Sequence, residues 1–215
     1  METGIALSED SLRGYAGSMA TQVQGKVRAA ALPSEERRST IVAATLPLFL
    51  EHGAAITTRE IAHAAGIAEG TIFRVFPDKT ALLDAVIEAA LDPAPTNAAM
   101  ERIDPGLPLE ARLVAAVEIL RKRVLYLFRV FSAASGTTRG AQPERSHDLP
   151  ALTAIFATEA SHLSRPPAEA ARVLRGLTFA CVHPSFGTDG PLTSEEIVAV
   201  LLDGIRDAKR GDASC

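Results

Sequence analysis

Residues 57–79 read TTREIAHAAGIAEGTIFRVFPDK and predict two short helices joined by a tight turn. Thr57 and Glu60 have the spacing of a capping box, in which a hydroxyl and a carboxylate satisfy free backbone N–H groups at the start of a helix. Gly66 stands where a chain that leaves a helix usually needs a left-handed residue. A second helix then runs to Pro77, which cannot continue it. The pattern is typical of a helix-turn-helix, whose second helix reads base edges in the major groove of DNA.

About residues 34–91 resemble the DNA-binding domain of the TetR family of transcriptional regulators. Family members have a glycine after the first helix, then T-x-x-x-I-A-x-x-A-G, then G-T-L/I-Y/F-x-x-F-x-x-K. The matching residues here are Gly53, Thr57, Ile61, Ala62, Ala65, Gly66, Gly70, Thr71, Ile72, Phe73, Phe76 and Lys79. The chain departs from the family at Phe73, Arg74 and Val75, where members often have an aromatic residue, a histidine and a second aromatic residue. The tyrosine hydroxyls that commonly contact phosphate in the family are therefore absent.

We predict that the second helix of the motif and its flanks contact DNA. Arg74 is the only long cation in that helix, and bidentate contact with a guanine edge is the strongest readout that an arginine makes. The alternative for Arg74 is a surface salt bridge with Glu69 or Asp78. Lys79, at the start of the next helix, is expected to hold phosphate. The other predicted contacts are Thr57, Ala68, Gly70, Thr71 and Phe73, where Thr57 is alternatively a helix cap and Phe73 a core residue.

The segment predicted to bind DNA is acidic. Between residues 34 and 92, five Lys and Arg stand against nine Asp and Glu, a net charge of −4 that equals the net charge of the whole chain. Domains that bind nucleic acid are usually basic, so a ligand- or partner-sensing module of the same fold without specific DNA binding is an alternative. Helix N-termini and a few bases can still hold phosphates while the acids face away.

The rest of the chain shows helical spacing of apolar residues and no strand-like alternation, which predicts an all-α fold. We expect an N-terminal three-helix DNA-binding domain with a helix-turn-helix over residues 34–91, and a C-terminal helical ligand-binding and dimerisation domain over residues 92–215. Four prolines interrupt the pattern in residues 92–108, where we place the boundary. Residues 1–33 are interpreted as a flexible N-terminal arm, and the sharper alternative is that Lys26 and Arg28 contact the minor groove or neighbouring phosphates.

Several helix boundaries follow from local signals. Ser34 is a good N-cap for the first helix, which contains Pro47, and Asp78 is expected to cap the helix after the motif. In the C-terminal domain, the spacing predicts a long helix over residues 109–132. Three further helices are predicted over residues 149–164, 167–183 and 194–209.

The family resemblance also implies how the C-terminal domain works. Family members bind small inducers between their long C-terminal helices and usually dimerise through the last two helices. We predict that Tyr126, Phe128, Phe131, Phe156 and Phe179 line a site for a largely hydrophobic effector. The last helix is apolar over much of its girth, and its predicted dimer residues are Val198, Leu201, Leu202 and Ile205. The alternative for this helix is a central position within its own subunit.

The residues carry no catalytic constellation. The histidines lack paired-ligand spacing, and neither a nucleophile elbow nor a phosphate-cradling glycine loop is present. We therefore expect no enzyme activity, cofactor or metal. Cys181 and Cys215 are expected to be free thiols because they have neither metal-ligand spacing nor a disulfide framework.

The expected location is the cytoplasm, because no apolar run approaches the roughly 20 residues of a membrane helix and the N-terminus is unlike a secretory signal. Taken with the resemblance, the residues indicate a homodimeric, ligand-responsive regulator that acts as a repressor. Its expected partners are double-stranded operator DNA of palindromic sequence and a small-molecule effector, with no membrane contact.

Overall fold

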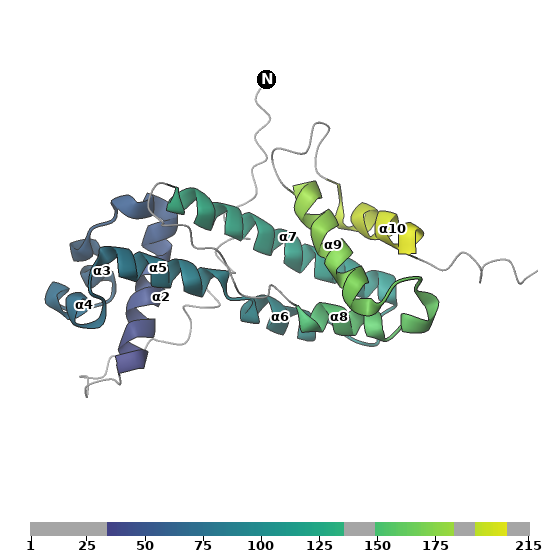
Figure 1. Ribbon diagram of the computed structural model, residues 1–215, viewed down its shortest axis with the longest axis horizontal. Coiled ribbons are helices and arrows are strands. Elements are labelled where there is room, and N and C mark those ends of the chain that lie inside the picture. Colours follow the sequence, from purple (N-terminus) through teal and green to yellow (C-terminus); the bar gives the residue numbers. More distant parts are fainter. Residues whose placement is uncertain (1–33, 136–148, 183–191, 206–215) are drawn as a thin grey trace, which may run out of the picture. The chain divides into compact units, whose positions relative to one another are not determined.

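The computed structural model describes residues 34–135, 149–182 and 192–205, and all regular structure in these ranges is helical (Figure 1). The all-α prediction is confirmed for this part of the chain. The chain divides into two compact units. Among the described residues, unit 1 contains 34–91 and 126–135, and unit 2 contains 92–125, 149–182 and 192–205.

Unit 1 is built from five helices and the end of a sixth. These are α2 (Ser34–His52), η1 (Gly53–Ala55), α3 (Thr58–Ala64), α4 (Glu69–Val75), α5 (Lys79–Leu91) and the last part of α7 (Leu109–Ala134). The buried side chains of Phe49, Ile61, Ile72 and Leu82 come from α2, α3, α4 and α5 and share one core. Because α3 and α4 have only seven residues each, this packing, rather than intrinsic helix stability, holds the helix-turn-helix in place.

The first helix is described from Ser34 onward and continues through its proline. Pro47 is exposed on α2 and removes one backbone hydrogen bond. On the buried side of the same helix, the Thr45 hydroxyl donates to the Ile41 carbonyl at 2.7 Å. Ile41 and Phe49 are 1% and 0% exposed. The buried face therefore holds α2 as one helix across Pro47.

The C-terminal part of α7 belongs to unit 1, although the sequence analysis assigned every residue after 91 to the C-terminal domain. Tyr126, Val130 and Ala134 recur at four-residue intervals, so they lie on one face of the helix. All three are buried in the core of unit 1. The predicted long helix is confirmed, but its apolar stripe packs in two different cores.

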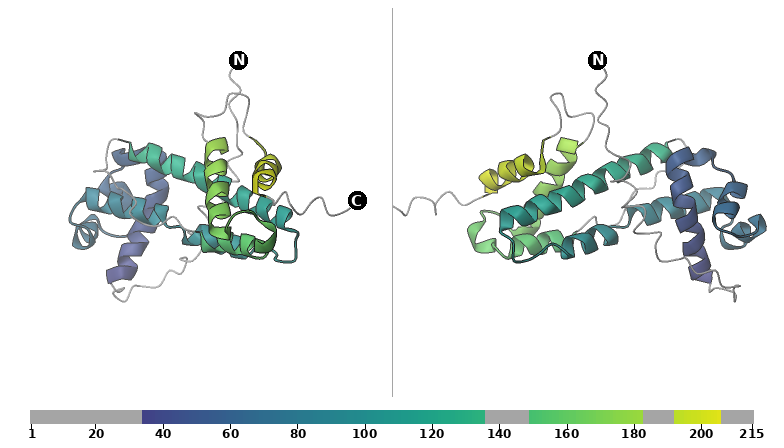
Figure 2. Two further views of the ribbon diagram at one scale, coloured as in Figure 1. Left: turned by 45° about the vertical axis from the view of Figure 1, so that its right-hand side comes forward. Right: turned by 180° about the vertical axis from the view of Figure 1, so that it is seen from behind.

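Unit 2 contains the remaining helices. They are α6 (Ala94–Glu101), residues 109–125 of α7, α8 (Pro150–Ala157), η2 (Ala160–His162), α9 (Pro167–Val182) and α10 (Ser194–Ile205). α9 packs against both α8 and α10, as the views in Figure 2 show. Leu113, Leu152, Leu174 and Val198 of four different helices are completely buried. These helices therefore enclose a single core.

Residues 94–101 form a helix where the prolines predicted an interruption. Pro93 is the cap of α6 and Pro95 lies in its first turn. At those positions a missing backbone N–H has little cost, because the first N–H groups of a helix have no intrahelical partner. Asp92 also accepts a hydrogen bond from the Ala94 backbone N–H at 2.9 Å. The prolines therefore start this helix.

The helix predicted over residues 149–164 is shorter than expected and ends at Ala157. The Thr158 hydroxyl donates to the Ile155 carbonyl at 2.9 Å and accepts from the Arg112 guanidinium at 2.9 Å. Local hydroxyl bonds of this kind compete with a further helical turn. The chain then forms the separate turn η2.

Candidate nucleic-acid interface

The turn between α3 and α4 has the hydrogen bonds that its sequence predicts. Thr57 accepts from the Glu60 backbone N–H at 3.2 Å, and its own backbone N–H donates to the Glu60 carboxylate at 2.7 Å. Gly66 has a left-handed φ of 65°, and the Ile67 backbone N–H donates to the Ala62 carbonyl at 3.0 Å. The capping box and the glycine turn are thus confirmed, and they set the direction in which α4 follows α3.

The hydrogen bonds of this cap also change the pKa of the Glu60 carboxyl. The backbone N–H of Thr57 and then its hydroxyl donate to this carboxylate, and they lower the pKa of Glu60 below its ordinary value of 4.5. Hydrogen bonds to the ionised form favour that form. The cap therefore depends on an ionised Glu60.

One face of α4 is buried and the opposite face is open. Ile72 is 0% exposed and anchors the helix in the core of unit 1, whereas Phe73 is 50% exposed. The alternative that Phe73 is a core residue is therefore wrong. Arg74 lies on the exposed face beside it. The remaining predicted contacts of this helix are Ala68 and Gly70, which are exposed, and Thr71, which is half-buried.

Arg74 does not form the surface salt bridge that was its alternative role. Glu69 accepts a hydrogen bond from the Thr58 hydroxyl, which joins the starts of α3 and α4. Asp78 accepts from the Ala81 backbone N–H at 2.8 Å and caps α5, as predicted. Within the ranges that the structure describes, neither carboxylate forms an ion pair with Arg74. Its guanidinium is therefore available on the exposed face of α4.

Lys79 has an intramolecular role that the sequence analysis missed. Its ammonium donates to the carbonyl of Ala54, the middle residue of η1, at 2.7 Å. An ammonium has three donors, so this bond leaves capacity for a phosphate, and that contact stays a prediction. The predicted arm residues Lys26 and Arg28 lie outside the described residues.

Arg38 is a further basic residue near the motif that the sequence analysis did not single out. Its guanidinium carbon lies 4.5 Å from the centroid of the Phe76 ring, which directly follows α4. Phe76 is 1% exposed, so the ring is a fixed platform for the cation. Only the folded structure brings these distant residues together, although a charged residue early in α2 was visible in the sequence.

The residues predicted to hold an effector are divided between the two units. Tyr126, Phe128 and Phe131 belong to unit 1, whereas Phe156 and Phe179 belong to unit 2. Tyr126 and Phe156 are buried in the two cores, and Phe131 and Phe179 are each 47% exposed. Their convergence on one effector site stays a prediction, because helical spacing identifies apolar residues but does not tell which of them share a space.

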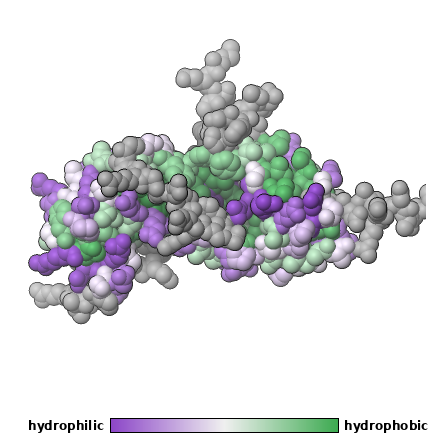
Figure 3. All heavy atoms as spheres, in the orientation of Figure 1, coloured by the Kyte–Doolittle hydropathy of each residue, from purple (hydrophilic) through white to green (hydrophobic). Residues whose placement is uncertain are grey.

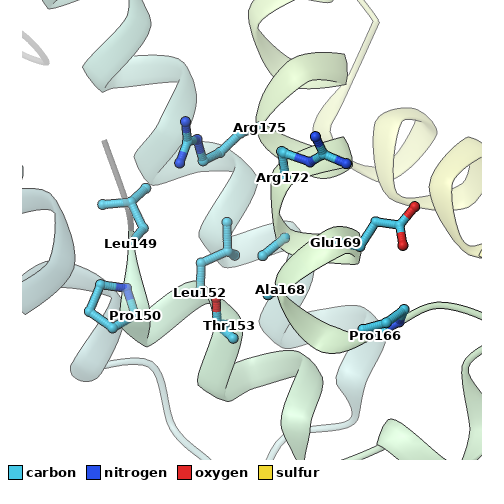
Figure 4. Close-up of a pocket in the computed structure, with 10 residues that line it drawn as sticks. Leu149, Pro150, Leu152, Thr153, Pro166, Ala168, Glu169, Arg172 and Arg175 are labelled. Carbon is cyan, nitrogen blue, oxygen red and sulfur yellow. The ribbon is translucent and has the colours of Figure 1, made fainter. Parts of the chain in front are cut away.

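Unit 2 instead has an open groove of about 680 Å³ between α8 and α9 (Figure 4). Leu149 and Ala171 contribute apolar surface to it, and Arg172 and Arg175 contribute guanidinium groups. The sequence offered one signal for this site, since two arginines three residues apart lie on the same side of a helix.

The predicted dimer residues are mostly core residues of unit 2. Val198, Leu201 and Leu202 are 0%, 2% and 1% exposed, and the Ile205 side chain lies outside the described part. A side chain that its own subunit encloses cannot meet a second subunit. The alternative of a central position within the subunit is therefore correct for the three described residues.

Other apolar side chains of α9 and α10 are exposed. Val173 and Phe179 of α9 are 39% and 47% exposed, and Val200 of α10 is 57% exposed. Figure 3 shows hydrophobic residues gathered over the region of α10, next to a band of hydrophilic residues. Val173, Phe179 and Val200 are three of the seven large hydrophobic residues that are exposed in the described part of the chain. On α10, the exposed apolar residue is therefore Val200, and not the predicted Val198, Leu201 and Leu202, which point into the core.

Within residues 34–135, 149–182 and 192–205, no cluster of His, Cys, Asp and Glu could hold a metal ion. Cys181 is a half-buried free thiol, and Cys215 lies outside the described residues. Among these residues, no helix combines the length and the hydrophobicity that crossing a membrane requires.

The helix-turn-helix segment matches a known protein family. Residues 41–86 match the family model described as "Bacterial regulatory proteins, tetR family". Among curated proteins, no sequence matches significantly.

Several solved structures share the fold. A regulator of Mesorhizobium loti assigned to the TetR family matches with a TM-score of 0.57 at 16% identity, over 81% of this chain and 98% of that one. A transcriptional regulator from Cytophaga hutchinsonii has a TM-score of 0.57 at 19% identity, with coverages of 78% and 97%. A tetR-family regulator from Streptomyces coelicolor has a TM-score of 0.52 at 23% identity, with coverages of 79% and 78%. Residues 41–86 therefore carry a tetR-family helix-turn-helix, and the chain shares the fold of these transcriptional regulators.

Proposed function

We propose that the protein is a homodimeric repressor that binds a palindromic operator and responds to a small ligand. Residues 34–91 would bind DNA, and residues 92–215 would supply dimerisation and effector binding. The observation that carries the proposal is the exposed face of α4, where Arg74 is outside any ion pair of the described residues. Two copies of α4 about 34–36 Å apart would enter successive major grooves.

We assign the DNA contacts as follows. Arg74 reads a guanine edge, and the exposed Phe73 ring and the Thr71 methyl group contact thymine methyls. Lys79 and Arg38 hold phosphates, together with backbone N–H groups at the helix starts. These few cations suit an acidic domain, because specificity then rests on base contacts and non-specific affinity is low.

The dimer contact is proposed for the exposed apolar side of α9 and α10. Val173 of α9 and Val200 of α10 supply its apolar surface. Apolar patches of this kind commonly mark protein–protein contacts. A two-fold dimer pairs the same patch on both subunits, and such symmetry matches the symmetry of a palindromic operator.

A ligand bound in unit 2 would favour a geometry in which the two α4 helices no longer fit successive grooves. Such coupling needs two sites and two states that the ligands distinguish. Ligand binding would thus release the operator, so that the ligand relieves repression.

Selection of bound sequences from random duplex DNA tests the proposal. We expect a palindrome to be enriched. On that operator, Arg74→Ala should cost about 1–3 kcal/mol per half-site and relax base preference at one symmetric pair of positions. Arg102→Ala, which removes an exposed arginine of unit 2, is the matched control and should leave affinity unchanged.

Failure to enrich any sequence would favour the alternative, a sensing module of the same fold without specific DNA binding. The net charge of −4 over residues 34–92 is the observation that favours it. Unchanged affinity and base preference in Arg74→Ala would move readout to Phe73 and Thr71.

A further inference from the structure

We infer that the groove between α8 and α9 binds an anionic amphipathic small molecule, with an apolar body and a carboxylate or phosphate monoester head. The effector first expected from the sequence was merely hydrophobic. The groove therefore specifies both a different place and a charge for the ligand. The inference deepens the ligand-responsive part of the proposed function and rests on it only for the effect on DNA.

The groove has the size and the apolar floor of a small-molecule site. Its volume is about 680 Å³, within the range of roughly 300–1,000 Å³ that ligand pockets occupy. Leu149 and Ala171 are 8% and 5% exposed and line the groove with apolar surface, and both belong with the completely buried Leu152 to the core of unit 2. An apolar chain or ring laid on this floor would leave water without displacing any core side chain.

Charge at the groove selects the head group. Arg172 and Arg175 lie three residues apart on α9, so both stand on the side of the helix that borders the groove. Figure 4 shows Arg175 extending toward Leu149, while Arg172 extends toward Glu169. Arg172 is exposed, so its side chain changes rotamer in picoseconds to nanoseconds. The Arg172 guanidinium can therefore turn toward the groove, where a guanidinium binds a carboxylate or a phosphate through two parallel N–H···O bonds.

The single acid of the groove does not cancel this preference. Glu169 is bonded by Arg165 through a contact of 3.3 Å. Its charge is thus already partly compensated from outside the groove lining. The groove presents two arginines and one paired carboxylate, and this composition disfavours a cationic ligand.

Binding to the full-length protein, without DNA, tests the inference with three probes of equal chain length. Sodium decanoate, nonyl phosphate and nonyltrimethylammonium, each with a nine-carbon alkyl chain on its head group, are titrated calorimetrically below the concentrations at which they form micelles. We expect the two anions to bind and the cation to bind at least 10-fold more weakly. The tighter anion identifies the head group, carboxylate or phosphate monoester. Equal binding of all three probes would overturn the inference, because the arginines would then play no part.

Variants locate the site. Arg172→Gln and Arg175→Gln should each weaken binding of the anions about 10-fold, the loss expected for one charge-assisted contact. Ala168→Phe fills the groove from an exposed position, so it should abolish binding without disturbing the core. Arg102→Gln, an exposed arginine of unit 2 outside the groove, should bind like the unmodified protein. Decanoate binding that survives Ala168→Phe would place the ligand elsewhere and overturn the inference.

The two proposals fail in different ways. Groove binding that leaves operator affinity unchanged would support the site and contradict the ligand response in the proposed function. Operator binding by a protein whose groove takes neither anion would support the DNA-binding function and overturn the inference about the groove.

Discussion

Two helical regions of this chain begin with the same capping device and end in different roles. Thr57 and Glu60 cap α3, and Thr193 and Glu196 form the same pair of bonds at the start of α10, at 3.2 Å and 2.8 Å. Beyond the cap, however, α3 leads into a helix whose predicted functional residues are exposed. In α10, the predicted functional residues are enclosed.

The difference teaches what an apolar stripe can and cannot indicate. In α4, Ile72 is the single buried residue, and the exposed residues follow from the geometry of a short motif. In α10, Val198, Leu201 and Leu202 were assigned to a partner, yet α7, α8 and α9 contribute to the core that buries them. A stripe indicates that a face will be covered, but it does not indicate by which element.

The largest expected effect tests that reading of α10. Leu201→Ala should cost about 2–5 kcal/mol of the free energy of unfolding, because it opens a cavity in a closed core. Val200→Ala, at a residue that is 57% exposed, should change the folding stability of the subunit by no more than about 0.5 kcal/mol. Urea denaturation with each variant measures both values.

The same neighbouring positions separate folding from assembly. Val200→Asp should reduce the dimer fraction in light scattering while the helical circular dichroism signal stays unchanged, since it places a charge in the proposed contact. If Leu201→Ala instead stayed fully stable and dissociated the dimer, the buried side of α10 would be the interface and the comparison would break down.

The next effect concerns unit 1, where two glycines have left-handed φ values of 59° and 65°. Gly53→Ala should be the more harmful, because its added Cβ would lie 3.0 Å from the Ala133 carbonyl oxygen, whereas Gly66 has no atom within 4 Å. The backbone conformation alone costs about 1–2 kcal/mol for a non-glycine residue. We expect Gly66→Ala to show this cost and Gly53→Ala to exceed it in denaturant titrations. Equal losses of stability in the two variants would mean that the α7 backbone at Ala133 shifts to make room for the added Cβ.

Lys79 tests whether one residue of unit 1 serves both structure and DNA binding. Lys79→Met should destabilise the protein by about 1 kcal/mol, less than the roughly 1.5–3 kcal/mol of a hydrogen bond to a buried charged group, because the side chain is only half-buried. It should also reduce the slope of log affinity against log salt by about 1 per half-site, if Lys79 holds phosphate. An unchanged salt slope with lowered stability would assign Lys79 to the η1 carbonyl alone.

The smallest effects come from the matched caps. Thr57→Ala and Thr193→Ala should each cost about 0.5–1 kcal/mol, because each leaves a helix-start N–H without its hydroxyl partner. Similar losses would show that the two regions differ only beyond their caps. A much larger loss in Thr57→Ala would indicate that the cap also positions α4.

The cap of α3 should also depend on pH. The pKa of Glu60 is lowered by the Thr57 backbone N–H and hydroxyl, so the folded state holds the proton less tightly than the unfolded state. The stabilising contribution is therefore complete above the ordinary pKa of 4.5 and is lost as the pH falls through the lowered value. The stability difference between the unmodified protein and Glu60→Gln should shrink over this acidic range. Asp84→Asn, at an exposed carboxylate of α5, controls for the loss of one negative charge.

Local sequence determined the parts of this protein whose cause is local. The capping box at Thr57, the turn at Gly66, the cap at Asp78 and the length of α7 follow from hydrogen bonds and periodicity within a few residues. The same reasoning failed at α6, because prolines break a helix in its interior but are tolerated in its first turn. It failed again after Ala157, where the bond from Arg112 comes from another helix.

Tertiary structure alone decided which residues share a surface. It placed Tyr126 in one core and Phe156 in the other, stacked Arg38 on Phe76, gave Lys79 to the Ala54 carbonyl, and paired the arginines of α9 with the apolar floor of a groove. Helical periodicity specifies a direction around one axis, whereas a site requires side chains from several axes to converge. That convergence depends on how the helices pack, and no single helix encodes it.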